Sequence, residues 1–193
     1  MICFPCWRGL GLAAALAFVL ALAACAPRET GCNRSAQAQI VFSASDTADT
    51  VTAQSLGPSC DAAVGVVTIR TPDGRPVWAW AAPLHPTFGN LFAAGREGPP
   101  GVETAQRFLS RWAALRVATT AAAPPWPQEA VQPPGAETSL DRLTYEDVRA
   151  RRLPMACQLS GVAREICLFW EPGAAAAAPL LERRIRAAPE EKE

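Results

Sequence analysis

Residues 63–81 read Ala-Val-Gly-Val-Val-Thr-Ile-Arg-Thr-Pro-Asp-Gly-Arg-Pro-Val-Trp-Ala-Trp-Ala, and this stretch predicts a β-hairpin. Its first half is dense in β-branched residues and its end alternates tryptophan with alanine, and both patterns favour strands. Between them, Asp73-Gly74 is a dipeptide typical of a tight turn. A two-residue turn at this point places Ile69 opposite Trp78 on the partner strand.

The same register places Val67 opposite Trp80. Because alternate residues of a strand point to the same side of a sheet, the side chains of these two pairs share one face. Such an apolar face needs a covering layer, so this hairpin is expected at the centre of the hydrophobic core.

Two helices are predicted to supply that layer. Residues 102–117 carry apolar side chains at helical spacing, which is typical of an amphipathic helix. Thr144 and Asp147 have the spacing of a capping box, so a second, short helix is expected to begin at Thr144. It should end by Pro154, because the residue before a proline disfavours helix.

A second hairpin is predicted over residues 155–169, where two strand-like runs flank Ser-Gly-Val-Ala at 160–163. If the turn centres on Val162, Cys157 lies directly opposite Cys167. Directly opposed residues of an antiparallel pair can meet the geometry of a disulfide. The sequence therefore favours a bond between these two cysteines among the three pairings that four cysteines allow.

Cys32 is then expected to pair with Cys60 by elimination. A metal site is not indicated, because the chain has one histidine, His85, and no Cys-x-x-Cys motif. No cofactor is expected either.

Other segments are harder to assign. Residues 39–43 look like a first strand, whereas residues 45–60 are rich in Ser, Thr, Asp and Ala and indicate a loop or a weak edge strand. Residues 83–89 are interpreted as a loop. The stretch 173–187 fits helix and strand equally well, because its alanines favour helix and Pro179 interrupts it.

These elements predict one α+β domain over residues 38–187, with a small antiparallel sheet of about four to six strands, two helices packed on it and two disulfides as staples. A proline-rich segment, 121–136, should be an extended and solvated loop. Before the domain we expect a signal peptide at 1–24 and a tether at 25–37. The charged residues 188–193 should form a disordered tail.

The expectation of a signal peptide comes from the first 25 residues. An apolar run from Gly9 to Ala24 follows the single basic residue Arg8, and it ends in Leu22-Ala-Ala-Cys25. This ending resembles the lipobox of bacterial lipoproteins. The resemblance implies that the chain is cut before Cys25, that this cysteine carries lipid, and that the protein is attached to a membrane without spanning it.

Two alternatives remain open from the sequence. The segment from Gly9 to Pro27 is long enough for an uncleaved membrane helix, and ordinary cleaved secretion would also fit. All three readings place the domain outside the cytoplasm. The lipobox reading places it in the bacterial cell envelope, facing the periplasm or the exterior.

Charge and motif content exclude several classes of partner. Lys and Arg number 18 and Asp and Glu also number 18, and such a balance gives no reason to expect nucleic acid. The glycines match neither a P-loop nor a dinucleotide fingerprint, so no nucleotide is expected. An envelope protein is the expected partner besides the membrane.

Catalysis is not indicated. His85 is the only side chain that titrates near neutrality without help, but no serine lies in a nucleophile-elbow motif to accompany it. We therefore expect a non-catalytic binding or structural module of the envelope. The alternatives, in order, are an inhibitor of a cell-wall hydrolase such as lysozyme and a small periplasmic hydrolase.

Candidate contact residues are His85, Trp126 between two loop prolines, and Ser160-Gly161 at the hairpin tip. For Trp126 the alternative is an anchor that folds the loop onto the domain. The last pair, followed by Phe-Trp at 169–170 in a disulfide-bearing chain, is similar to periplasmic lysozyme-inhibitor lipoproteins. That resemblance implies that Ser160 and Gly161 enter a lysozyme cleft. The chain departs from this family by lacking a tyrosine just after the loop.

Overall fold

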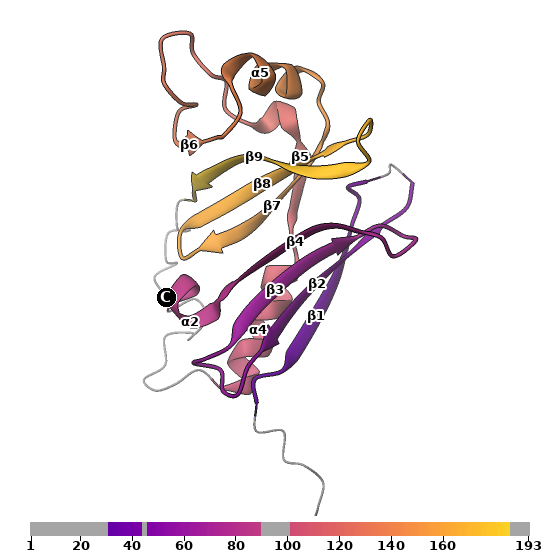
Figure 1. Cartoon of the computed structure of the whole chain (residues 1–193), viewed down its shortest axis with the longest axis vertical. Helices are drawn as coiled ribbons and strands as arrows, with labels where there is room; N and C mark the ends of the chain where they lie inside the picture. Colours follow the sequence, from indigo (N-terminus) through magenta and orange to yellow (C-terminus); the bar gives the residue numbers. More distant parts are fainter. Residues whose placement is uncertain (1–30, 44–45, 90–100, 186–193) are drawn as a thin grey trace, which may run out of the picture. The chain divides into compact units, whose positions relative to one another are not determined.

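A computed structural model describes residues 31–43, 46–89 and 101–185. Cys25, the lipobox-like sequence and the expected tail at 188–193 lie outside these residues. Within the compact unit that begins at Gly31, the described residues form two antiparallel sheets, with helices beside them (Figure 1).

The first sheet contains four strands in sequence order, and we call it sheet A. It consists of β1 (Arg34–Ile40), β2 (Asp49–Leu56), β3 (Val64–Arg70) and β4 (Pro76–Pro83). Burial alternates strictly along β2 and β3, so one face of the sheet is buried and the other meets solvent.

The central hairpin of the sequence is the β3–β4 pair. Ile69 lies opposite Trp78 and Val67 lies opposite Trp80, as predicted. The turn is longer than two residues, because the register shifts after Ile69 and the Thr71 amide donates to the Arg75 carbonyl at 3.0 Å. Gly74 has φ of 84°, a conformation that glycine adopts without steric cost.

The second sheet, sheet B, has the order β5-β7-β8-β9-β6. Its strands are β5 (Arg116–Thr119), β7 (Pro154–Gly161), β8 (Arg164–Glu171), β9 (Ala176–Arg184) and the short β6 (Ala136–Glu137). The expectation of a single sheet of four to six strands is therefore corrected to two sheets. The described chain is mostly β, and α+β describes it only roughly.

Several segments differ from their predicted structure. β2 is an inner strand within the segment 45–60, where only a loop or an edge strand was expected. β1 begins at Arg34, inside the segment assigned to a tether. Residues 84–88 form the short helix α2 (Leu84–Phe88) instead of a loop. The undecided segment at 173–187 contains β9, and the pairing of β8 with β9 shifts register opposite Pro179, as expected for a proline at a bulge.

Both predicted helices are present. α4 (Val102–Ala113) buries its apolar side as expected, but it ends earlier than residue 117 because β5 begins at Arg116. A 3₁₀ turn, η1 (Thr120–Ala122), follows β5. α5 (Arg142–Ala150) has Asp141 as its N-cap, and this carboxylate accepts the Thr144 amide at 3.0 Å. The sequence predicted Thr144 as the cap, and the structure has Asp141 in that role.

The hydrophobic core has two parts, one on each face of sheet B. The first lies between sheet A, α4 and the face of sheet B that includes Ala156 and Leu168. Trp112 connects these layers, because its ring packs edge-on against Trp80 at 5.8 Å between centroids and its Nε1 donates to the Leu159 carbonyl at 3.0 Å. The second core lies on the other face, under α5.

Both predicted disulfides are present. Cys32 is bonded to Cys60, and Cys157 is bonded to Cys167. The latter two residues are direct partners across β7 and β8, which confirms the register predicted from the turn at Val162.

Candidate binding site: an arginine-lined hollow

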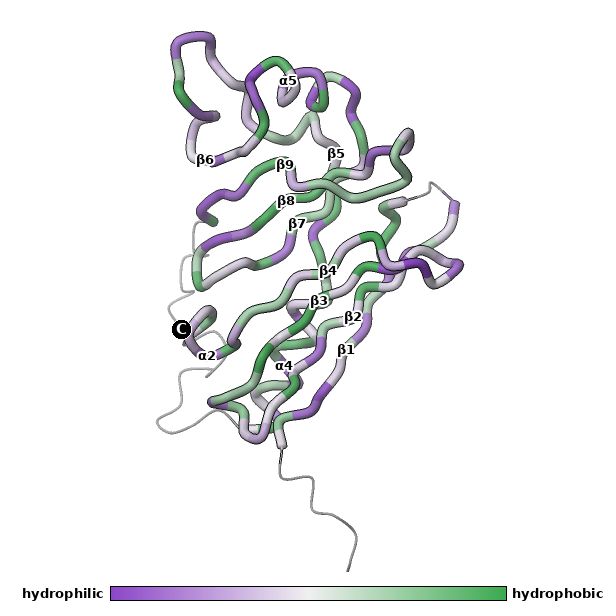
Figure 2. The backbone as a smooth tube through the Cα atoms, in the orientation of Figure 1, coloured by the Kyte–Doolittle hydropathy of each residue, from purple (hydrophilic) through white to green (hydrophobic). Residues whose placement is uncertain are grey.

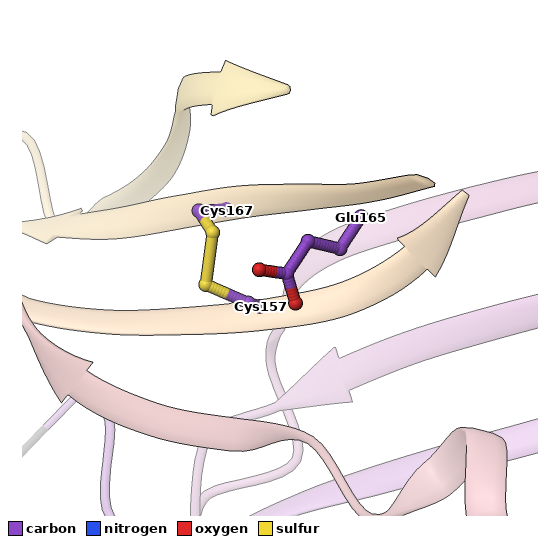
Figure 3. A group of neighbouring side chains, drawn as sticks. All are labelled: Cys157, Glu165 and Cys167. Atoms are coloured by element: carbon purple, nitrogen blue, oxygen red, sulfur yellow. A yellow bond between two sulfur atoms is a disulfide. The ribbon is translucent and has the colours of Figure 1, made fainter. Parts of the chain in front are cut away.

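Glu165 is a buried carboxylate in the middle of sheet B. It lies on β8, opposite Leu159 of β7 and Arg183 of β9, and it is 6% exposed. Figure 3 shows its side chain beside the disulfide of Cys157 and Cys167. A buried carboxylate is costly unless charged partners satisfy it, so its neighbours define the chemistry of this place.

Two arginines satisfy that carboxylate. Arg116 of β5 donates from Nη2 to Oε1 of Glu165 at 2.5 Å, and Arg183 donates from Nε to the same oxygen at 2.7 Å. The charges are thus held in place from two strands on opposite sides of β8. A guanidinium group has five N–H donors, and each of these two uses one of them on Glu165.

Beside this triad the surface is hollowed, with a volume of about 550 Å³. Arg184 also lines the hollow, together with Pro124, Pro134 and Gly135 of the proline-rich loop. Within the described residues the Arg184 side chain makes no hydrogen bond or ion pair. Among the described residues that line the hollow, three arginines therefore accompany one carboxylate, and positive charge is in excess.

The positive charge of Arg164 is balanced by carboxylates, whereas that of Arg184 is not balanced within the described part of the chain. Arg164 lies directly opposite Arg184 across β8 and β9, and its Nε donates to Oε1 of Glu182 at 3.0 Å. Glu137 also contacts it at 3.3 Å. These contacts, chiefly the hydrogen bond with Glu182, raise the pKa of Arg164 above its ordinary value. Among the described residues of the hollow, Arg116 and Arg183 therefore share the one carboxylate of Glu165, and the Arg184 side chain has no acidic partner.

The candidate contact residues named from the sequence lie elsewhere. His85 is exposed in the first turn of α2, and within the described residues its ring has no serine or carboxylate bonded to it. The Ser160 side chain has an internal partner, because its hydroxyl donates to Oε1 of Glu182 at 2.7 Å. Gly161 is buried at the end of β7. The structure brings neither His85 nor this pair into the hollow.

Trp126 is a loop anchor. Its Nε1 donates to the Ala130 carbonyl at 2.8 Å, its amide donates to Glu146 at 2.6 Å, and its ring packs edge-on against Tyr145 at 5.6 Å. The loop at 121–136 is consequently held to the second core at Trp126 and Ala136, whereas residues such as Val131, which is 88% exposed, remain in contact with solvent.

Cys157, Glu165 and Cys167 place their candidate ligand atoms within 4.8 Å of one another, the spacing of a metal centre. The two sulfur atoms are bonded to each other (Figure 3). Because thiolates are the form in which cysteine binds metal, the oxidised chain offers only the Glu165 carboxylate here.

Sequence reasoning missed the arginine-lined hollow. A usable signal was Glu165 itself, because it stands two residues before Cys167 and so shares the face of the predicted disulfide. Its partners gave no signal, since Arg116 fell inside the expected helix and Arg183 inside the undecided segment.

Comparison with known protein families, with curated proteins and with solved structures finds no match to this chain. The assignment of a site therefore rests on geometry. None of the helices in the described part of the chain has the length and apolar character that crossing a bilayer requires.

Proposed function

We propose that this chain is an exported lipoprotein of the bacterial cell envelope, attached to a membrane through lipid on Cys25, and that its domain is a non-catalytic binding module. The apolar run before Cys25 supports the anchor. The two disulfides support an oxidising compartment, because such bonds are rare in the cytoplasm.

The observation that carries the binding role is the placement of Arg116 and Arg183 on one buried carboxylate beside Arg184. Glu165 orients two guanidinium groups that line the hollow, and each of them uses only one of its N–H donors on this carboxylate. Arginine remains protonated at physiological pH, so it binds anions and does not transfer protons. The hollow is suited to an anionic group on an envelope component, such as a carboxylate or phosphate.

The anchor is tested by mass spectrometry of the chain expressed in a bacterium. We expect a mature protein that begins at Cys25 and carries acyl chains, and a Cys25→Ala variant that is not lipidated. A chain found uncut, or cut elsewhere without lipid, would contradict this part of the proposal.

The hollow is tested by calorimetric titration with inorganic phosphate and with citrate. Arg184→Gln should weaken binding about 10-fold or more, since a hydrogen bond to a charged group contributes about 1.5–3 kcal/mol. This variant leaves both contacts of Glu165 intact. Arg111→Gln is the matched control, because Arg111 is exposed on α4. Equal weakening by both variants, or no binding by the unaltered chain, would count against the hollow.

A further inference from the structure

The solvent face of sheet A becomes apolar at one end. Leu56, Val64 and Pro83 lie side by side on β2, β3 and β4, because Leu56 pairs with Val64 and Val64 pairs with Pro83. Leu56 is 51% exposed and Val64 is 41% exposed. The next row adds Val66 and Ala81. We call these five residues the end patch.

Beyond the end patch, the same face is largely polar. Gln54 shares the row of Val66 and Ala81, the following row holds Thr52, Thr68 and Ala79, and the charged residue Arg70 comes at the far end. Figure 2 shows β3, which supplies Val64 and Val66, as hydrophobic along much of its length, whereas β1 is largely hydrophilic. On the solvent face of sheet A, the register places the larger apolar side chains at one end.

That end is where the described chain begins. The Cys32 amide donates to the Gly57 carbonyl at 2.9 Å, and Gly57 directly follows Leu56. The proposed lipid on Cys25 is six residues before Gly31. A chain spans at most about 3.6 Å per residue, so the proposed anchor is no more than roughly 20 Å from the start of the domain.

Resting on the proposed lipid anchor, we infer that the end patch contacts the surface of the membrane that holds the chain. The short connection keeps the patch at a high local concentration of lipid, so a weak contact is sufficient to be populated. Exposed leucine, valine and proline without charges suit the boundary between headgroups and acyl chains, where apolar side chains are buried.

The contact is tested with the lipidated full chain in nanodiscs that contain a nitroxide-labelled phospholipid. The methyl signals of Leu56 and Val64 should be attenuated several-fold more than those of Val41. Val41 is the matched control, because it is 50% exposed and follows the opposite end of β1. Leu56→Glu should reduce the attenuation at Val64, whereas Val41→Glu should leave it unchanged. Equal attenuation at Val41 and Leu56 would overturn the inference.

Two further results distinguish a failure of the membrane contact from a failure of the proposed lipid anchor. If mass spectrometry finds no lipid on Cys25, the proposed anchor fails, and the patch is then tested on a chain held by an N-terminal histidine tag to nickel-chelating lipid. If the lipid-free chain sediments as a dimer that Leu56→Glu dissociates, a second copy occupies the patch and the membrane contact is wrong.

Discussion

Glu165 accepts hydrogen bonds from both Arg116 and Arg183 on one carboxylate oxygen. The two arginines come from β5 and β9, which lie on opposite sides of β8, so one buried charge positions side chains from two other strands. The stability of sheet B and the shape of the hollow therefore depend on the same residue.

Glu165→Gln should destabilise the domain by about 1–3 kcal/mol. Removing one partner of a buried ion pair costs about 3–5 kcal/mol when the remaining charge stays buried, and the cost is lower here because the Arg116 side chain is half exposed. Urea unfolding measures the change. Glu137→Gln is the control, since Glu137 makes an exposed pair with Arg164 and such pairs contribute about 0–1 kcal/mol. An equal loss in both variants would remove the special role of Glu165.

Gly65→Ala should destabilise the domain by about 1–3 kcal/mol through overpacking. A methyl group at Gly65 would lie 2.3 Å from Leu84 Cδ2 and 2.8 Å from Trp112 Cζ3, inside the first core. Gly101→Ala is the matched control, because nothing lies within 4 Å of its added methyl group. Thermal unfolding should show a clearly lower melting temperature for Gly65→Ala and little change in melting temperature for Gly101→Ala. Two unchanged melting temperatures would mean that the core at Trp112 is looser than described.

Cys157→Ala should cost about 2–5 kcal/mol, the usual effect of losing a native disulfide. Unfolding in urea under non-reducing conditions provides the measurement, with Cys157→Ala/Cys167→Ala as the control that leaves no free thiol. Peptide mapping without reduction should recover Cys157 joined to Cys167. A peptide that joins Cys60 to Cys157 would refute the pairing of β7 with β8.

Tyr145 should ionise far above the usual pH for tyrosine. Burial raises its pKa to about 12, and its hydroxyl donates to the Pro124 carbonyl at 2.8 Å. Because Tyr145 is the single tyrosine, ultraviolet absorbance of the phenolate reports it directly. The unfolded chain in denaturant is the control and should titrate near 10.

The raised pKa of Tyr145 also makes the stability of the domain depend on pH. The folded state disfavours the phenolate, so the stabilisation that burial of neutral Tyr145 provides is complete below pH 10 and is lost as the pH rises toward 12. Urea unfolding at pH values across this window should show a falling free energy, and Tyr145→Phe should flatten that fall. A folded-state midpoint near 10 would show that the ring is open to solvent.

Local patterns predicted the strand pairing of both hairpins correctly, although each pairing shifts register next to its turn, after Ile69 in the first hairpin and between Leu159 and Gly161 in the second. Val67 and Trp80, and likewise Cys157 and Cys167, are close in sequence and are joined by recognisable turns, so period-two alternation fixes their register. Neither hairpin contains information on how strands divide between sheets. The division into sheet A and sheet B depends on contacts over long distances in sequence, which a local pattern does not encode.

The missed strands have a different cause. β2 buries Val51 and Ala53, but it also buries Asp49 and Ser55. The Asp49 carboxylate is satisfied by the amides of Phe42 and Ser43. The composition of β2 is that of a loop. It becomes an inner strand because these polar groups are buried against specific partners. Tertiary contacts here override composition.

The candidate site could not be predicted from the sequence either, because it also depends on contacts between residues far apart in the chain. Arg116 and Glu165 are 49 residues apart, and their meeting requires β5 to pair with β7 and β7 with β8. For Trp126 the sequence left two alternatives, an exposed contact residue and an anchor of the loop. Its hydrogen bonds with Ala130 and Glu146 favour the anchor.

The connectivity of the disulfides has a consequence for biogenesis. Each bond joins cysteines that are consecutive among the four in the domain, Cys32 with Cys60 and Cys157 with Cys167. If Cys3 and Cys6 leave with the proposed signal peptide and Cys25 carries lipid, a chain oxidised progressively from its amino end would form both native bonds in the order in which the thiols emerge. Such a chain would need an oxidant but no isomerase to correct mispaired intermediates.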